Sequence, residues 1–480
     1  MRRFLPFKKT FLLFLPAILC VPALTKAQWS AKKTISPKAF SAFLNENMGP
    51  CLAVSGDSLY VTWSDKRTTG SGIFCTHSYD TGATWSPAVP LTDTLNGKTT
   101  FPAIAVSGRN VHVVFLDTLV NGDTASFYMH STDGGNTWST PYCLDSNTKF
   151  WPGVAAHGAL VVVSLNKSLA STNTEVFFRR STDNGNNWDP EQQISNAPNR
   201  SEDPAINTDG KNVFLSWNDK RSGQMLIYYR RSTDMGLTWG PETARSYYDS
   251  YTSMVSLNHA STDVPYGSTL SGHFEVWLRQ SHDSGTTFDS AQQLTNNING
   301  DAYPYLVRDS SSMHLVYLQF GTGGGPLYIH SGDGGTTWDP AVSFGSGGQP
   351  FIVYTSCMLH VIFPDSGKIY YTRNPTGNGD CSTSAIAAVS SPILKTSLSA
   401  NPSIFNKSTS IEYSLSENGN VDLEIYDING RIAKTLVNGY HNAGEGNTIL
   451  LDSSNLAPGM YFCRLITTSS EVSQKIIITH

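Results

Sequence analysis

Two aspartate–arginine pairs stand in nearly identical contexts in this chain and are its first candidates for chemistry. The sequences Trp-Ser-Asp-Lys-Arg and Trp-Asn-Asp-Lys-Arg place Asp65 two residues before Arg67, and Asp219 two residues before Arg221. Each pair follows an apolar run, so we expect it in a loop at the end of a strand. Two such arginines could grip an anionic or polyhydroxyl ligand. The interpretation that we favour is an ion pair that only shapes its loop, because such pairs are common and weak.

Further tyrosines and carboxylates are predicted to lie in loops at the same end of the molecule. Tyr247 and Tyr248 are the aromatic candidates for ligand binding. A pair of carboxylates beside them could serve a glycosidase, or the same side chains could form a floor on which sugars stack without reaction. The other members of this group are Glu202, Asp203, Asp249, Tyr251, Asp301 and Tyr303. No catalytic residue is assigned, because a sequence does not give the distances between these groups.

Other chemistries lack support in the sequence. No G-x-S-x-G, H-E-x-x-H, G-x-x-x-x-G-K-[ST] or Cys-x-x-Cys motif occurs, so we predict no cofactor and no metal site. His112, His314 and His360 stand in apolar runs, where packing is expected rather than metal binding. Charged residues make up 15 % of the chain and the net charge is −5, which excludes a polybasic nucleic-acid binder.

The residues that must position these loops are organised by an internal repeat. An eight-residue pattern, S-x-D-x-G-x-T-W, starts at residues 78, 131, 181, 232, 281 and 331, at intervals of 49 to 53 residues. Its Ser and Asp can accept hydrogen bonds from nearby backbone N–H groups, and its Gly allows a positive φ, as the tip of a β-hairpin requires. The aspartates and closing aromatics are predicted to be structural: Asp80, Trp85, Asp133, Trp138, Asp183, Trp188, Asp234, Trp239, Asp283, Phe288, Asp333 and Trp338.

Four short strands per repeat predict an all-β fold, a β-propeller. The first three strands recur seven times, but the last set, which ends with Lys-Ile-Tyr-Tyr-Thr-Arg-Asn at 368–374, has no fourth strand. Residues 28–36 match the fourth-strand pattern of residues 187–195. We therefore predict seven blades over residues 28–375, with the N-terminal segment completing the last blade so that no strand edge stays exposed. Six blades is the alternative.

The repeated hairpin resembles the Asp-box, or bacterial neuraminidase repeat, of the sialidase-like propellers. In that family the boxes lie on outer hairpins away from the ligand, which implies a structural role for the six aspartates. Sialidases also share an Arg-Ile-Pro tripeptide, an arginine triad, a Tyr nucleophile with a Glu partner, and an Asp acid. This chain has no Arg-Ile-Pro tripeptide. The resemblance therefore implies the architecture more strongly than the activity.

Residues 396–480 resemble a second family. Alternating runs with turns at Glu-Asn-Gly-Asn and Asn-Gly predict a small immunoglobulin-like β-sandwich. Asn401-Pro402, the run 421–431 and Leu-Ala-Pro-Gly-Met-Tyr at 456–461 resemble the type A C-terminal sorting domain of the type IX secretion system. That resemblance implies the secretion machinery as a partner and export to the cell surface or the medium.

The predicted order along the chain is a signal peptide at 1–27, the propeller at 28–375, a Gly- and Ser-rich linker at 376–395 and the sorting domain at 396–480. The start is basic, and the apolar stretch that follows is short for a membrane span, as in secretory signals. No transmembrane span is predicted in the mature chain. Three functions stay open: a glycan or surface-polymer binder, a sialidase-like glycoside hydrolase, and a protein-binding adhesion module.

Overall fold

A computed structural model shows an all-β chain. The described residues are 29–36, 42–43, 51–66, 71–92, 98–119, 122–170, 172–246, 250–251, 254–258, 261–269, 272–309, 312–355, 358–374, 396–415, 419–441, 444–454, 456–467 and 471–479. The predicted signal peptide and the predicted linker lie outside them. The chain divides into two compact units, Met1–Cys381 and Ser382–His480. No α-helix occurs among the described residues.

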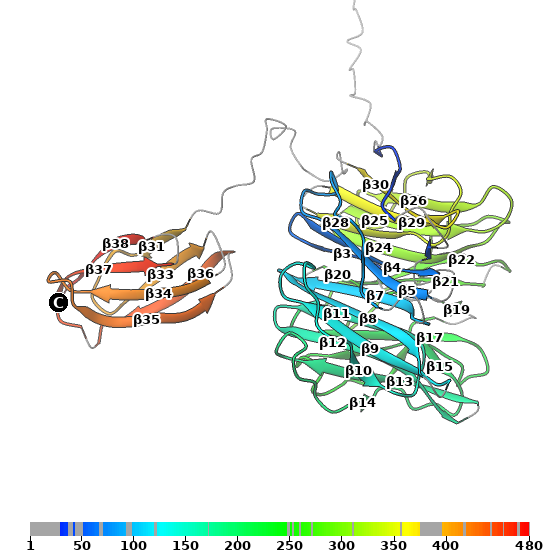
Figure 1. The fold of residues 1–480 in the computed structure, drawn as a ribbon, viewed down its shortest axis with the longest axis horizontal. Coiled ribbons are helices and arrows are strands. Elements are labelled where there is room, and N and C mark those ends of the chain that lie inside the picture. The colour runs from blue at the N-terminus through cyan, green and yellow to red at the C-terminus, as the bar shows by residue number, and fades with distance from the viewer. Residues whose placement is uncertain are drawn as a thin grey trace, which may run out of the picture. The chain divides into compact units, whose positions relative to one another are not determined.

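The described residues of the first unit form seven antiparallel sheets, as many as the blades predicted (Figure 1). The first three are β3 (Leu52–Ser55), β4 (Ser58–Lys66), β5 (Ser71–Ser78) and β6 (Val89–Pro90), with β2 (Ala42–Phe43) also on β4; β7 (Thr100–Ser107), β8 (Asn110–Thr118), β9 (Thr124–Ser131) and β10 (Tyr142–Asp145); and β11 (Thr148–His157), β12 (Leu160–Ala170), β13 (Asn173–Ser181) and β14 (Gln192–Gln193).

The other four sheets repeat this order. They are β15 (Ser201–Thr208), β16 (Val213–Asp219), β17 (Leu226–Ser232) and β18 (Thr243–Ala244); β19 (Ser250–Tyr251), β20 (Ser256–Asn258), β21 (Ser261–Ser268), β22 (Glu275–Ser281) and β23 (Gln292–Gln293); β24 (Asp301–Asp309), β25 (Ser312–Gln319), β26 (Gly325–Ser331) and β27 (Val342–Ser343); and β28 (Phe351–Thr355), β29 (Met358–Asp365), β30 (Lys368–Asn374) and β1 (Lys33–Thr34). The first strands contact one another in the order β3, β7, β11, β15, β20, β24, β28 and back to β3. They therefore form the inner ring of the unit.

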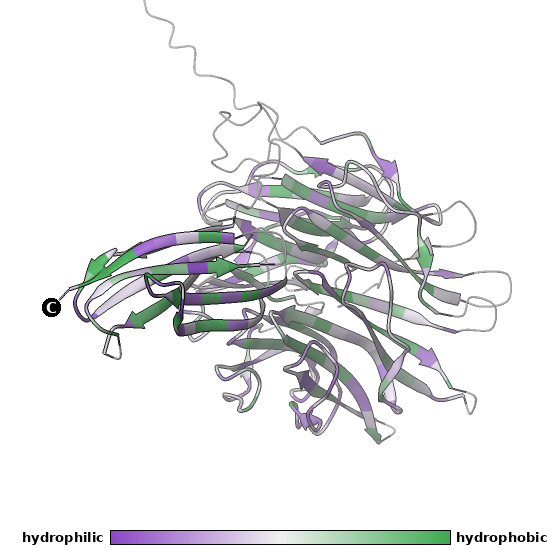
Figure 2. Cartoon of the chain, turned by 60° about the vertical axis from the view of Figure 1, so that its left-hand side comes forward, coloured by the Kyte–Doolittle hydropathy of each residue, from purple (hydrophilic) through white to green (hydrophobic). Residues whose placement is uncertain are grey.

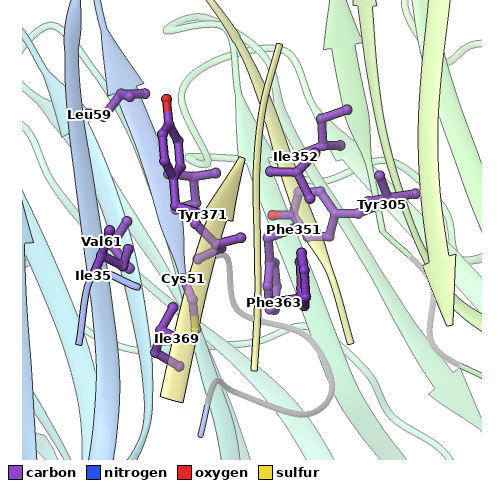
Figure 3. Packing of buried hydrophobic residues seen from close by; sticks show 14 of the residues in the cluster. Ile35, Cys51, Leu59, Val61, Tyr305, Phe351, Ile352, Phe363, Ile369 and Tyr371 are labelled. Carbon is purple, nitrogen blue, oxygen red and sulfur yellow. The ribbon is translucent and has the colours of Figure 1, made fainter. Parts of the chain in front are cut away.

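The N-terminal segment completes the last sheet, as predicted. Lys33 pairs with Tyr371, and Thr34 pairs with Tyr370, in antiparallel register. The backbone N–H of Ser30 donates to the carbonyl of Arg373 at 2.8 Å. Ile35 is buried in the same apolar cluster as Ile369 of β30 and Val61 of β4 (Figure 3). Strand pairing across more than three hundred residues therefore closes the ring.

The turns of the repeated motif press against the preceding sheet. Gly185 has a φ of 85°, and a Cβ added there would lie 1.8 Å from the Tyr128 hydroxyl. Gly82 has a φ of 79° and would meet the hydroxyl of Tyr371 at the same distance. Only glycine fits, because both the backbone conformation and the close approach exclude a side chain.

Four of the six closing aromatics pack edge-on against a third-strand aromatic of the preceding sheet. The ring centroids are 4.9 Å apart in Trp188–Tyr128, 5.0 Å in Trp239–Phe178 and Trp85–Tyr371, and 5.4 Å in Phe288–Tyr229. Trp29 packs on Tyr328 in the same way, at 5.0 Å and 78°. The seventh sheet lacks the repeated motif, and the N-terminal segment therefore supplies its tryptophan as well as its fourth strand.

Three histidines belong to these seams. His112, His314 and His360 are fully buried, and their Nδ1 atoms lie 2.7 to 2.8 Å from the hydroxyls of Tyr128, Tyr328 and Tyr371. Tyr128 donates to the Asn184 carbonyl at 3.2 Å, so Nδ1 of His112 must be the donor toward Tyr128. Burial lowers the pKa of all three imidazoles to about 3. The sequence left core and surface packing open for these strand histidines, and the structure places all three in the core.

The second unit is a two-layered β-sandwich. One sheet contains β31 (Ser397–Asn401), β33 (Ser408–Leu415) and β36 (Gly444–Asp452); the other contains β32 (Ile404–Phe405), β38 (Glu471–Ile478), β37 (Gly459–Ile466), β34 (Gly419–Tyr426) and β35 (Ile432–His441). One buried cluster joins Ile411 of the first sheet to Leu423 and Cys463 of the second. Figure 2 shows hydrophobic residues, in green, alternating with hydrophilic ones, in purple, along the strands, as sheets with one buried face require.

Replacing Trp29 with Ala tests the closure of the ring. We expect Trp29→Ala to lower the free energy of unfolding of the first unit by about 3–5 kcal/mol, as for other large buried aromatics. Trp188→Ala should cost a similar amount, because the two rings pack alike. Urea denaturation monitored by circular dichroism measures both. Leu237→Ala is the control, since that side chain is 55 % exposed. A Trp29 variant no less stable than this control would contradict the closure.

Candidate functional site

The described candidate residues lie near the starts of first strands or the ends of second strands. In the fourth sheet Ser201, at the start of β15, pairs with Asp219 at the end of β16, and Asp219 pairs with Leu226 at the start of β17. The turns of the repeated motif follow the ends of the third strands, at the opposite end of each sheet. We call the end at which the first strands begin and the second strands finish the strand-start end.

Four inner strands carry a strained residue at this end, each directly before a proline. Their φ angles are 52° at Phe101, 20° at Trp151, 56° at Asp203 and 55° at Tyr303. A one-residue bulge accompanies each of them, because the register shifts between 100 and 103, 150 and 153, 202 and 205, and 302 and 305. Positive φ at non-glycine residues is costly and clusters at functional sites.

The strained residues are three aromatics and one carboxylic acid. The three aromatic side chains are half-buried, and the rings of Phe101 and Trp151 lie 5.6 Å apart, edge to face. Tyr303 contacts Phe320 at 6.1 Å, also edge to face. Because they occupy the same position in sheets whose first strands form one ring, these residues surround the strand-start end of that ring. Aromatic faces and one acid are a composition suited to binding sugars.

Asp203 is the unusual ionisable group of this end. Its side chain is buried, and Oδ2 accepts a hydrogen bond from Asn218 Nδ2 at 2.7 Å. Oδ1 has no hydrogen-bond partner among the described residues. Burial, together with the charge of Glu202, raises the pKa of Asp203 to about 7. Glu202 itself pairs with Arg200 at 2.5 Å. Near neutral pH Asp203 is therefore half-protonated, and its carboxyl can both donate and accept hydrogen bonds.

Asp219 and Arg221 form a closed network within their own sheet. Arg221 Nε and Nη2 donate to the two oxygens of Asp219 at 2.8 and 2.7 Å, and Nη1 lies 2.5 Å from Glu242. Asp219 is fully buried and also accepts hydrogen bonds from Trp217 Nε1 and Ser201 Oγ, both at 3.0 Å. These contacts occupy both groups and support the interpretation that the pair shapes its loop.

The other predicted ligand residues are only partly described. Asp65 is buried at the end of β4, at the position that Asp219 holds in β16. Arg67, Tyr247, Tyr248 and Asp249 lie outside the described residues, and so does the side chain of Tyr251. Asp301 is buried and accepts a hydrogen bond from Gln319 at 3.2 Å. Phe101 and Trp151 were not among the sequence candidates, although both stand directly before the proline of a first strand.

The repeated aspartates use their carboxylates within their own turns. In every copy the Ser hydroxyl donates to Oδ1 at 2.7 to 2.8 Å. The backbone N–H four residues after each Asp also donates to Oδ1, at 2.8 to 2.9 Å. The hydroxyl and the backbone N–H of Thr238 lower the pKa of Asp234 to about 2. These hydrogen bonds favour the ionised carboxylates and hold the shape of each turn.

The described part of the chain bears on two further kinds of site, those for metals and those for membranes. No group of three or more His, Cys, Asp or Glu side chains there could hold a metal ion. No helix in it is long and apolar enough to cross a membrane.

Comparison with known proteins identifies both units. The BNR repeat-like domain family matches residues 21–316, and the secretion system C-terminal sorting domain family matches residues 401–479. No curated protein matches the chain. The sorting domain directs export by type IX secretion to the cell surface or the extracellular space.

Solved structures share the fold at low sequence identity. A polysaccharide lyase of family 25, an ulvan lyase bound to a GlcA–Rha3S chain, is 11 % identical with a TM-score of 0.50 over 71 % of this chain and 95 % of its own. The Hadza microbial sialidase Hz136 is 16 % identical, with a TM-score of 0.41 over 57 % of this chain and 63 % of its own length. The sialidase of Trypanosoma rangeli is 9 % identical, with a TM-score of 0.42 over 90 % and 84 %.

Replacing Asp203 with Asn tests the strained acid. Because the pKa of Asp203 is raised in the folded chain, the folded chain binds the proton more tightly than the unfolded chain does. The free energy of unfolding therefore falls as the pH rises from about 4 to about 7. The substitution Asp203→Asn removes this loss of stability. We therefore expect the variant to be more stable than the native chain at pH 8, by roughly 2–4 kcal/mol, and as stable as the native chain at pH 4. Denaturant titrations at both values measure the difference. Equal stability of the two proteins at pH 8 would contradict the raised pKa.

Proposed function

Because the chain belongs to the BNR repeat-like domain family, we propose that it is an exported glycan-binding protein whose ligand lies at the strand-start end of the first unit. The observation that carries the proposal is the strained set before the prolines: Phe101, Trp151, Asp203 and Tyr303. Backbone strain persists only where surrounding structure imposes it, and here it places three aromatic side chains and one acid at the same end of four sheets.

The chemistry of this set fits a carbohydrate chain. Sugar rings present C–H faces that pack on aromatic rings, and Phe101 and Trp151 offer two such rings in edge-to-face contact. Asp203 has one oxygen with no partner among the described residues, so a sugar hydroxyl could hydrogen-bond to it. Such a hydrogen bond would also satisfy a buried polar atom that is costly to leave alone.

Binding without turnover accounts for the remaining groups more simply than hydrolysis does. Hydrolysis of a sialoside would need arginines for the substrate carboxylate, and the described donors of Arg221 are used by Asp219 and Glu242. A second carboxylate free to act with Asp203 is also required, and Glu202 is paired with Arg200. The chain also lacks the Arg-Ile-Pro tripeptide.

One observation favours a glycoside hydrolase as the second candidate. A carboxylic acid whose pKa is raised to about 7 is suited to protonate a leaving group at neutral pH. In that case Asp203 would be the general acid. A protein-binding adhesion module is the outcome left if no carbohydrate is bound or cleaved.

A glycan array tests the proposal. The native chain, with its sorting domain, should bind a carbohydrate on a panel that includes sialylated and uronic-acid polymers. Trp151→Ala should weaken that binding about tenfold or more, since stacking on the ring is lost. Tyr142→Ala is the matched control, because that tyrosine is 48 % exposed on the outer strand β10. Equal losses in both variants, or no bound carbohydrate, would reject the site.

A hydrolysis assay separates the two candidates. Chromogenic glycosides, α-sialosides included, should not be turned over by the native chain. Turnover that disappears in Asp203→Asn would replace the binding proposal with a hydrolase in which Asp203 is the acid.

A further inference from the structure

A pocket of about 500 Å³ lies between the first two sheets, away from the inner ring. The first sheet contributes Leu91 and its neighbours at the end of β6. The second sheet contributes Phe115 and Asp117 of β8, Phe127 of β9 and Pro141 before β10. The pocket therefore combines aromatic walls with one carboxylate.

The aromatic wall is a cross-strand pair. Phe115 and Phe127 are register partners, and their rings stack at 5.9 Å with an angle of 17°. Asp117 follows on the same strand and accepts hydrogen bonds from the backbone N–H groups of Thr118, at 2.8 Å, and of Lys98. No ion pair joins Asp117 to a cation within the described residues. Its burial raises the pKa of the carboxyl, as expected for an acid lacking a nearby positive charge.

The seventh sheet shows what the same place holds elsewhere in this chain. Phe363 and Tyr370 are register partners there and stack at 6.0 Å with an angle of 20°. The ammonium of Lys32 lies 5.4 Å from both ring centroids. It also donates a hydrogen bond to the carbonyl of Phe344, in the preceding sheet, at 3.0 Å. A cation from the chain itself therefore covers this aromatic pair.

Two further sheets cover the equivalent ring in the same way. In the third sheet the ammonium of Lys167 lies 4.8 Å from the ring of Phe177 and pairs with Glu191 and Asp145. In the fourth sheet the guanidinium of Arg221 lies 4.2 Å from the ring of Tyr228. Phe177 and Tyr228 occupy the position that Phe127 holds in the second sheet, as the strand registers show.

The second sheet differs at the residue that supplies the cation in the seventh. Lys32 stands three residues after Trp29, and Pro141 stands three residues after Trp138. Proline brings no charge, and no cation–π contact to Phe127 occurs among the described residues. The second sheet thus keeps an aromatic pair and a carboxylate where other sheets of this chain place their own cation.

We propose that the pocket between the first two sheets binds the primary ammonium group of a ligand, held against Phe127, the half-buried ring of the Phe115–Phe127 pair, and paired with Asp117. We place the ligand ammonium where Lys32 places its own ammonium in the seventh sheet, against the equivalent pair of aromatic rings. Aromatic faces attract cations, and the attraction grows where water is partly excluded. Such an ammonium group can come from a lysine side chain or from a deacetylated amino sugar. This site is separate from the strained set that carries the proposed function.

Calorimetric titration of the full mature chain tests the site with two pairs of probes. N-α-acetyl-lysine amide and a glucosamine disaccharide carry the ammonium, whereas their N-acetylated counterparts do not. We expect binding of at least one ammonium probe and about tenfold weaker or no binding of its acetylated counterpart. The stronger of the two ammonium probes identifies the source. Absence of binding by both ammonium probes would overturn the proposal.

Substitutions at the carboxylate show whether binding occurs in this pocket. Asp117→Asn should weaken binding of the ammonium probe about tenfold, because the ion pair is lost while shape is kept. Asp365→Asn is the matched control, since Asp365 holds the same position in the seventh sheet, where Lys32 already covers the aromatic pair. Equal affinities for the Asp117 variant and the native chain would overturn the proposal.

A second substitution fills the pocket from within. Pro141→Lys should place an ammonium against Phe127, as Lys32 does against the equivalent ring in the seventh sheet, so it should abolish probe binding and raise the melting temperature. Pro141→Gln is its uncharged counterpart and should keep binding. Loss of binding in Pro141→Gln to the same extent would show that the ammonium position was assigned wrongly. Unchanged binding by Pro141→Lys would show the same. Glycan binding through Trp151 should be unaffected by either variant, so the two proposals can fail separately.

Discussion

The first unit depends on the close approach of repeated turns to third-strand aromatics of the sheet before them, which occurs at Gly82, Gly185, Gly236 and Gly285. A glycine with positive φ lets the turn reach the third-strand aromatic of its neighbour, as Gly185 does at Tyr128. The closing tryptophan then packs edge-on against the same ring. The ring of Tyr128 is therefore in contact with both the turn and the indole of the next sheet. Because every sheet needs a neighbour on each side, the arrangement is stable only when the ring is closed, and Trp29 closes it.

This scaffold explains why backbone strain is tolerated at its other end. The inner strands are fixed by register on one edge and by contact with neighbouring first strands. Bulges at Phe101, Trp151, Asp203 and Tyr303 therefore persist, although each costs free energy. Asp203 adds a second cost, because burial disfavours its charged form. Costs of this kind are expected at sites kept for function rather than for stability.

Divergence among the repeats carries information of its own. Because the seven sheets share one geometry, a residue in one sheet can be compared with the residues at the equivalent positions of the other sheets. Cations of the chain cover the third-strand ring in three sheets, at Phe177, Tyr228 and Tyr370. At Phe127 the ring instead lines a pocket beside Asp117. Three equivalent rings are thus covered by a cation of the same chain, whereas the ring of Phe127 is not covered by a described cation.

The sequence by itself determined the repeat, the strand order and the pairing of residues 28–36 with the last sheet, because each depends on local periodicity and on the count of strands. It also placed three histidines on strands, although their burial was decided by the fold. The strained set and the cation positions were decided only by tertiary structure. A bulge before a proline has no distinctive composition, and the pKa of Asp203 depends on burial and on the nearby Glu202. The partners of Arg221 likewise come from a loop and a strand that meet only when the sheet is folded, as Glu242 shows.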